Sequence, residues 1–294
     1  MNNQILDFKP IYELTKRRLR GLRKLAEKRS DFGRSEEMLL VLLGNMNQRL
    51  NTMFILLNND ISDGIYPLQR TFFEMQIAYI AMIKSKDKQK FVEFYQDKNS
   101  FETTNKINRF MVGDNTRAKK SFDSWEKEYV AIVREQSQKT LKESSKRSEL
   151  KGNRLYKLWF ELASGKSLQE LAKEFGKGYE YFACFDEPSN WIHAQRIEMN
   201  INVETYEKFM NPAYFNLMLL ALLQDIHFFQ QAVADFAFYI KVDNSKQLGD
   251  YGEKYSKFLT DLRRIIDERY KSEFDPEAYE QFKTEIMTWT SENK

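Results

Sequence analysis

The sequence predicts an all-α protein, built as a multi-helix bundle, and three observations support this. Apolar residues recur at three- and four-residue spacing nearly throughout the chain, and neither strict alternation nor Val/Thr-rich runs indicate a strand. Only 11 glycines and five prolines occur in 294 residues, so few turns and long elements are expected. The chain is 42% apolar, which is enough for a sizeable core. Its length fits one large domain or two small ones, and we expect a single helical domain over residues 1–294.

Two apolar helices are predicted to form the centre of this bundle. The stretch 65–84 is apolar on almost every face, a pattern typical of a central helix. Residues 213–240 form the second, and Asn211-Pro212 before them reads as an N-cap followed by proline at the first helical position. More amphipathic helices are predicted around them, at residues 10–29, 35–57 and 88–112.

The middle of the chain is expected to leave the bundle. Residues 118–148 are charged and carry only a sparse apolar stripe, so we predict a long charged helix that protrudes as an arm over about 115–152. Short helices follow at 153–163 and 167–175, and the second begins with a capping box of Ser167 and Glu170.

The remaining predicted helices are interrupted once by a loop signal. A helix at 179–185 is expected to stop at Asp186-Glu187-Pro188, before a new one over 189–197. Amphipathic helices at 246–271 and 277–289 make up a peripheral C-terminal layer over 245–294.

Composition argues against several classes of protein. The net charge of +3, from 46 basic and 43 acidic residues, gives no global case for nucleic-acid binding. The single cysteine, Cys184, excludes an intramolecular disulfide, and with only two histidines we expect no metal and no cofactor. The first 20 residues contain no secretory signal, and the longest apolar run, 217–223, is too short to cross a bilayer. We therefore expect a cytoplasmic protein without membrane contact.

Known sequence motifs give little information about the function of this protein. The chain has no P-loop, no dinucleotide fingerprint, no nucleophile elbow and no H-E-x-x-H. The segment SLQELAKEFGKG looks like the first helix and turn of a helix-turn-helix, but the following YEYFACF favours burial rather than exposure in a DNA groove. Sequence-specific DNA binding is therefore not expected.

Arg70 and Glu74 are the first candidate for chemistry. They lie four residues apart in the predicted central helix and share one face, next to Phe72, Phe73 and Met75. A charge in such surroundings must be paired and hydrogen-bonded, or it costs several kcal/mol. The pair is either a structural ion pair that fixes helix register or one wall of a polar pocket.

Ser189 and His193 are the second candidate, again four residues apart and just after Pro188. Ser189 could cap a helix that starts there, and the His193 imidazole could act as a general base, as a donor to phosphate or as a hydrogen-bonded core residue. A polar stripe on the helix at 213–240 is best explained as a solvent-facing strip, with a polar channel as the alternative; it comprises Asn216, Gln224, His227, Gln231 and Asp235.

The order of these pieces resembles a family of prokaryotic all-helical proteins of unknown function, and we expect a bacterial protein. The resemblance covers about residues 38–240. That family has R-x-x-x-E on an early apolar helix, and later a Trp, S-x-x-E-L-A, a Tyr and S-x-x-x-H. The matching positions here are Arg70 to Glu74, Trp159, Ser167 to Ala172, Tyr179 or Tyr181, and Ser189 to His193. The resemblance implies a helical bundle and no established activity.

A more distant likeness is to the higher-eukaryote and prokaryote nucleotide-binding (HEPN-like) helical domains. Many of those are ribonucleases of toxin or phage-defence systems, with an Arg followed by a His as the active pair. Here the order differs, because the Arg nearest to His193 is Arg196, downstream of it.

These observations lead to one spatial hypothesis. Arg70 and Glu74 are expected to face Ser189 and His193 across the bundle, with Arg70 as an anion clamp and His193 as the acid–base group. Tyr181, Ser189 and Arg196 are the expected ligand-binding residues. Whether the protein is an enzyme stays open; if it is one, a metal-independent ribonuclease-like activity on RNA or a nucleotide is expected. The alternative is a non-catalytic helical scaffold or a homodimer formed through an amphipathic surface.

Overall fold

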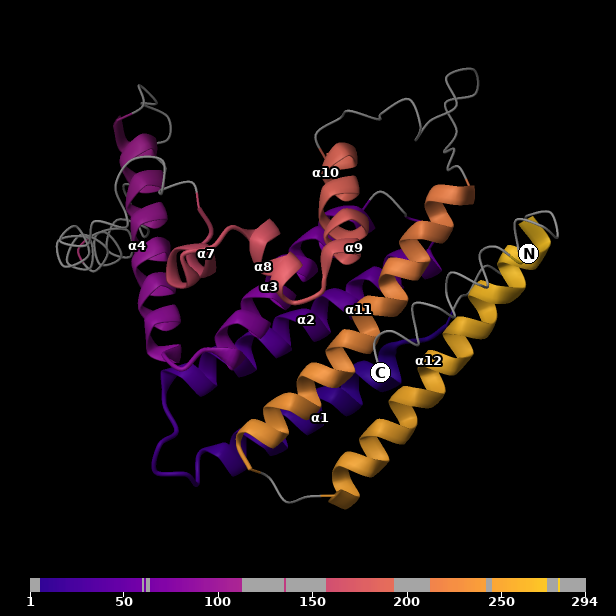
Figure 1. The fold of residues 1–294 in the computed structure, drawn as a ribbon, viewed down its shortest axis with the longest axis horizontal. Coiled ribbons are helices and arrows are strands. Elements are labelled where there is room, and N and C mark those ends of the chain that lie inside the picture. The colour runs from indigo at the N-terminus through magenta and orange to yellow at the C-terminus, as the bar shows by residue number, and fades with distance from the viewer. Residues whose placement is uncertain are drawn as a thin grey trace, which may run out of the picture.

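The computed structural model describes residues 6–59, 61, 64–112, 135, 157–192, 212–241, 245–273 and 280. All regular secondary structure in these ranges is helical, which confirms the predicted all-α class (Figure 1). Nearly all of the predicted arm at 115–152 and the predicted helix at 277–289 lie outside the described residues, as do Asn211 and the segment 193–211.

The first four helices lie close to their predicted positions. Two agree with the prediction at both ends: α3 (Ile65–Lys84) and α4 (Lys88–Val112). The helix α2 (Arg34–Asn58) is one residue longer at each end than expected. The first helix, α1 (Lys9–Ala26), ends earlier than the predicted Arg29, because the backbone N–H groups of the next residues close a turn after Ala26.

The described residues after 157 form five short helical segments, the π-helix η3 among them, and then two long helices. The short segments include α7 (Trp159–Ser164) and α8 (Leu168–Glu174), and the predicted capping box at the start of α8 is confirmed: Ser167 Oγ accepts from the backbone N–H of Glu170 at 3.2 Å. The other short segments are α9 (Gly178–Tyr181), the π-helix η3 (Phe182–Asp186) and α10 (Glu187–Ile192). The two long helices are α11 (Pro212–Tyr239) and α12 (Ser245–Glu273).

The predicted break at residues 186–188 is wrong. The chain continues as a helix from α9 through η3 into α10. The backbone N–H of Glu187 donates to the carbonyl of Phe182, five residues back, as in a π-turn. Pro188 is the second residue of α10, so its missing N–H falls at the transition from π to α hydrogen bonding. Ser189 therefore lies inside the helical run and does not cap a new helix.

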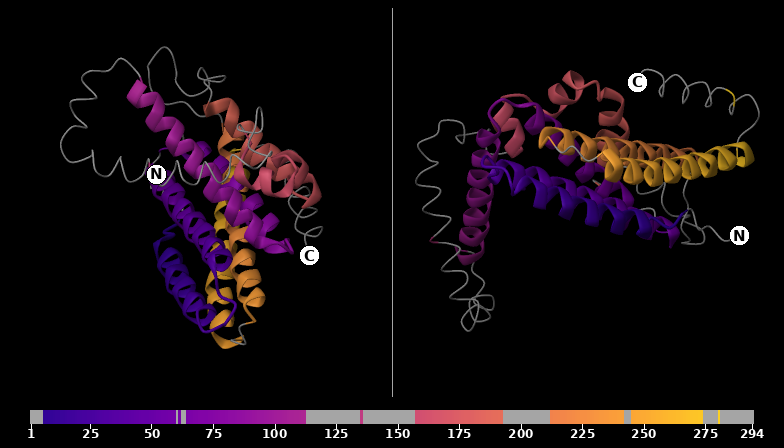
Figure 2. Two further views of the ribbon diagram at one scale, coloured as in Figure 1. Left: turned by 90° about the vertical axis from the view of Figure 1, so that its left-hand side faces the viewer. Right: turned by 90° about the horizontal axis from the view of Figure 1, so that it is seen from below.

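The two helices predicted to be central do lie in the core. Along α3, Phe72, Phe73 and Ile77 are fully buried, and α11 buries Phe229 and Phe236. In Figure 1, α1, α2, α11 and α12 run along a common diagonal, and Figure 2 shows α4 standing across that direction at one end. Both α2 and α11 pack against α3, whose other side contacts η3 and α10. This arrangement brings α3, which carries Arg70 and Glu74, next to η3 and α10.

The helix α12 forms an outer layer against α11 and α1, as expected for an amphipathic C-terminal helix. It buries five apolar and aromatic side chains at three- and four-residue spacing: Tyr251, Tyr255, Phe258, Leu262 and Ile266. Among the described residues, no helix combines the length and apolar character needed to cross a membrane.

Asp225 is a buried carboxyl group that the sequence did not single out. Asp225 of α11 is 1% exposed, and its Oδ2 has no hydrogen-bond partner among the described residues. Its Oδ1 lies 4.0 Å from the Sγ of buried Cys184 in η3. Burial, helped by the nearby carboxylate of Glu180, raises the pKa of Asp225 well above its usual range. Asp225 therefore keeps its proton to higher pH in the folded protein than in the unfolded chain.

This buried proton makes stability depend on pH. Because the folded-state pKa of Asp225 is raised, its contribution is fully present below the ordinary value of 3.8 and is lost as pH rises through the folded-state pKa. We expect Asp225→Asn to remove this loss, so that the difference in unfolding free energy between the variant and the wild type grows in favour of the variant as pH rises.

Urea unfolding at a series of pH values measures this difference. The matched control is Asp250→Asn, which changes an exposed aspartate of α12 and should leave the pH dependence as in the wild type. If the free-energy difference between Asp225→Asn and the wild type is the same at every pH, the pKa of Asp225 is not raised in the folded protein.

Candidate functional site

The candidate site starts from two charges on one face of α3. Arg70 and Glu74 are one helical turn apart, and Arg70 Nε lies 3.7 Å from Glu74 Oε1. Their side chains are 26% and 25% exposed, so the pair is partly desolvated and still open to solvent. The sequence predicted that these charges would be at least partly buried, and the structure confirms it.

An aromatic cluster joins this face of α3 to η3. The Phe73 ring centroid lies 6.1 Å from that of Tyr181 and 6.3 Å from that of Phe185, and Tyr181 and Phe185 are 5.3 Å apart. The guanidinium carbon of Arg70 lies 4.6 Å from the centre of the Phe185 ring, a cation–π contact. Arg70 is therefore held on one side by Glu74 and on the other by Phe185, about a hundred positions away in the sequence.

The structure places only some of the predicted residues in this cluster. Arg70, Glu74 and Tyr181 are in it, and Ser189 lies one turn beyond Phe185, where its Oγ donates to the Phe185 carbonyl at 2.6 Å. His193 and Arg196 lie outside the described residues. The last described residue of α10 is Ile192, immediately before His193, and α10 packs against α3.

Two further charged residues contribute to the site, and neither was predicted. Arg49 of α2 donates from Nε to Thr71 Oγ1 at 2.9 Å and exerts an electrostatic effect on Glu74. Glu161 of α7 acts on both Glu74 and Tyr181, and its two oxygens accept from the backbone N–H groups of Leu158 and Leu168 at 2.7 and 2.6 Å. A single charge inside the apolar run around Arg49 was a possible sequence signal, but its partner could not be read from the sequence.

Burial and the neighbouring charges together shift the pKa of Glu74. Burial is the largest effect and raises the pKa of Glu74, and the nearby carboxylate of Glu161 raises it further. Arg70 and Arg49 act in the opposite direction without cancelling the rise. The pKa of Tyr181 is also raised, first by burial and then by Asp186. Glu74 is thus a carboxyl group able to hold or release a proton nearer to neutral pH than an exposed glutamate.

The residues of this site are suited to binding an anion and to transferring a proton. A guanidinium positioned from two sides can donate to phosphate oxygens in a fixed geometry. A carboxyl group with a raised pKa is suited to proton transfer. Within the described ranges, no group of three or more His, Cys, Asp or Glu side chains is arranged to hold a metal ion.

The comparisons with known proteins add one finding. The model of a family described as "Family of unknown function (DUF5677)" matches residues 36–208, more than half of the chain. The matched region contains α2, α3 and α7 through α10, and so all the residues of the candidate site. No curated protein and no solved structure matches the chain significantly. Because the family model matches more than half of the chain, this protein belongs to the DUF5677 family of unknown function.

Proposed function

We propose that the protein binds a phosphate-bearing ligand, RNA or a nucleotide, at the cluster of Arg70, Glu74, Tyr181 and Ser189, together with His193 and Arg196. One observation carries the proposal: Arg70 is held between Glu74 and Phe185 on the face of α3 that packs against the helix leading into His193. A constrained, partly exposed guanidinium is suited to phosphate recognition.

In this proposal each residue has a stated role. Arg70 donates to phosphate oxygens, Glu74 orients Arg70 or His193, and His193 moves the proton. The aromatic side chain of Tyr181 borders the cluster, where it can contact a base or ribose. The likeness to HEPN-like domains supports RNA as the phosphate-bearing ligand and a toxin or phage-defence system as the setting.

The test is incubation of a short labelled single-stranded RNA with the wild type and with His193→Ala, in the presence of a chelator. The proposal predicts cleavage by the wild type that His193→Ala loses, while both proteins give the same helical circular-dichroism spectrum. His227→Ala is the matched control, since it removes the other histidine and should cleave like the wild type. Equal cleavage by wild type and His193→Ala, or none by either, would exclude the ribonuclease reading.

A non-catalytic scaffold that forms a homodimer is the second candidate, and the surface of α2 favours it. Val41 and Ile55 are 57% and 52% exposed on this helix, with uncharged Gln48 and Thr52 between them on the same face. An uncharged helix face that exposes two large apolar side chains is suited to self-association. Sedimentation at several concentrations tests this candidate, because a dimer through this face should dissociate in Val41→Lys. A non-catalytic scaffold should also cleave no RNA.

A further inference from the structure

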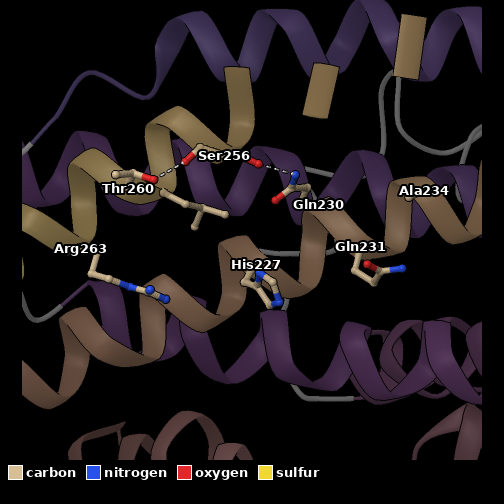
Figure 3. Close-up of a pocket in the computed structure, with 8 residues that line it drawn as sticks. His227, Gln230, Gln231, Ala234, Ser256, Thr260 and Arg263 are labelled. Carbon is tan, nitrogen blue, oxygen red and sulfur yellow. Dashed lines mark hydrogen bonds between the residues drawn. The ribbon is translucent and has the colours of Figure 1, made fainter. Parts of the chain in front are cut away.

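A second polar site lies on the opposite side of α11 from the core, where α12 runs beside it. The two helices border a pocket of about 390 Å³, drawn in Figure 3. Six of the lining residues are polar and two are aliphatic: His227, Gln230, Gln231, Ser256, Thr260, Arg263, Ala234 and Leu259. All of them follow residue 208, so the pocket lies outside the part of the chain that the family model matches. None of these residues belongs to the Arg70 cluster.

Arg263 is the residue that indicates a ligand. It is exposed, and within the described part of the chain it has neither an ion pair nor a hydrogen bond. Its neighbours on α12 differ: Arg264 pairs with Glu268 at 2.8 Å, and Lys271 pairs with Asp267 at 3.0 Å. In Figure 3 the guanidinium of Arg263 extends from α12 toward His227 of α11. The pocket therefore contains a cation that no described carboxylate neutralises.

The surroundings of His227 are also positive. His227 is exposed at its surface, but the partial desolvation of its imidazole between α11 and α12 lowers its pKa, and the charges of Lys177 and Arg263 lower it further. Lys177, from the turn before α9, is itself paired with Glu180 at 2.7 Å, and the carboxylate on the same face of α11, Asp235, accepts from Gln231 at 2.9 Å. An anion in the pocket would offset the two cations and would favour the protonated imidazole.

The remaining wall offers hydrogen bonds but no aromatic surface. The Gln230 side-chain nitrogen makes only long contacts, at 3.4 Å to the Gly252 carbonyl and 3.5 Å to Ser256 Oγ. Thr260 Oγ1 donates to the Ser256 carbonyl at 2.9 Å. Amides and hydroxyls of this kind suit the hydroxyl groups of a small polyol. Among the described lining residues there is no Phe, Tyr or Trp, so none of them offers a nucleobase a ring to stack on.

We propose that the pocket between α11 and α12 binds a small sugar phosphate, with Arg263 and His227 contacting the phosphate and Gln230, Ser256 and Thr260 contacting the hydroxyl groups of the sugar. Arg263 donates to two phosphate oxygens through its planar fork. The site is separate from the RNA or nucleotide site on α3, and its occupancy does not require that site to function.

Isothermal titration calorimetry on the full chain tests the proposal, with glucose 6-phosphate, ribose 5-phosphate, glycerol 3-phosphate, inorganic phosphate and glucose as probes. We expect at least one of the three phosphate esters to bind one-to-one and more tightly than inorganic phosphate, and glucose not to bind. Arg263→Ala should weaken binding about tenfold or more, since a charge-assisted hydrogen bond is lost. The matched control is the adjacent Arg264→Ala, which should bind like the wild type.

Each contrary result overturns a defined part of the proposal. No binding of any phosphate ester, or equal binding by wild type and Arg263→Ala, would overturn the site. Binding of inorganic phosphate as tight as that of the esters would overturn the sugar assignment. Arg70→Ala should leave these affinities unchanged, so failure of this pocket and failure of the α3 site are distinguishable. The imidazole NMR signal of His227 gives a second readout, because phosphate binding should raise its pKa.

Discussion

Replacing Arg70 by alanine is expected to weaken RNA binding about tenfold or more without unfolding the protein. The loss follows from the removal of charge-assisted hydrogen bonds to phosphate, each of which is worth about 1.5 to 3 kcal/mol. The fold should survive, because the contact of Arg70 with the Phe185 ring contributes about 0.5 to 2 kcal/mol and the remaining Glu74 carboxyl group is still partly open to solvent.

Fluorescence anisotropy with a labelled single-stranded RNA measures this effect at several salt concentrations. The slope of log affinity against log salt should fall by about one in Arg70→Ala, as for the loss of one phosphate contact. Arg70→Lys should recover only part of the affinity, because an ammonium group lacks the planar fork. Arg23→Ala, which removes an exposed arginine paired with Glu27 on α1, is the control. Wild-type affinity in Arg70→Ala at every salt concentration would disprove the role given to Arg70.

The second large effect is expected on stability, from Phe73→Ala. Phe73 is fully buried and its ring contacts both Tyr181 and Phe185, so it joins α3 to η3. Truncation of a buried phenylalanine removes its apolar burial and leaves a cavity, at a cost of about 3 to 5 kcal/mol. We expect unfolding free energy to fall by that amount, and RNA binding to weaken as well, because Phe185 then loses the ring that supports it under Arg70.

Urea unfolding monitored by circular dichroism checks this prediction, and the same segment offers a control. Phe182 is the first residue of η3 and is 48% exposed, so Phe182→Ala should change stability by no more than about 0.5 kcal/mol. Similar losses in the two variants would mean that the aromatic cluster does not join α3 to η3 as described.

Local sequence signals predicted the elements whose ends they mark directly. The bounds of α3 and α4 followed from apolar spacing between clear turn residues, and the start of α8 followed from the hydrogen-bonding capacity of Ser167 and Glu170. The π-helix η3 could not be predicted in this way. Its wider turn depends on packing against α3 and accommodates Pro188, which by sequence alone signals a break.

The candidate site was predicted in part for the same reason. The four-residue spacing of Arg70 and Glu74 showed that they share a face of a helix, and the structure places that face against η3 and α10. Arg49 and Glu161 were missed, because they reach Glu74 from α2 and α7 through the tertiary fold. On α11, the polar stripe did mark His227 and Gln231, which face solvent, but it could not show that Arg263 of α12 completes a pocket with them.

The proposed function requires the guanidinium of Arg70 on α3 to lie near the imidazole of His193. Because the chain has only two histidines, NMR can follow the titration of each imidazole separately. Arg70→Gln removes a positive charge that disfavours the imidazolium form, so the midpoint of the His193 titration should move to higher pH, by about one pH unit, while that of His227 stays constant. A His193 midpoint that is the same in wild type and Arg70→Gln would contradict the claim.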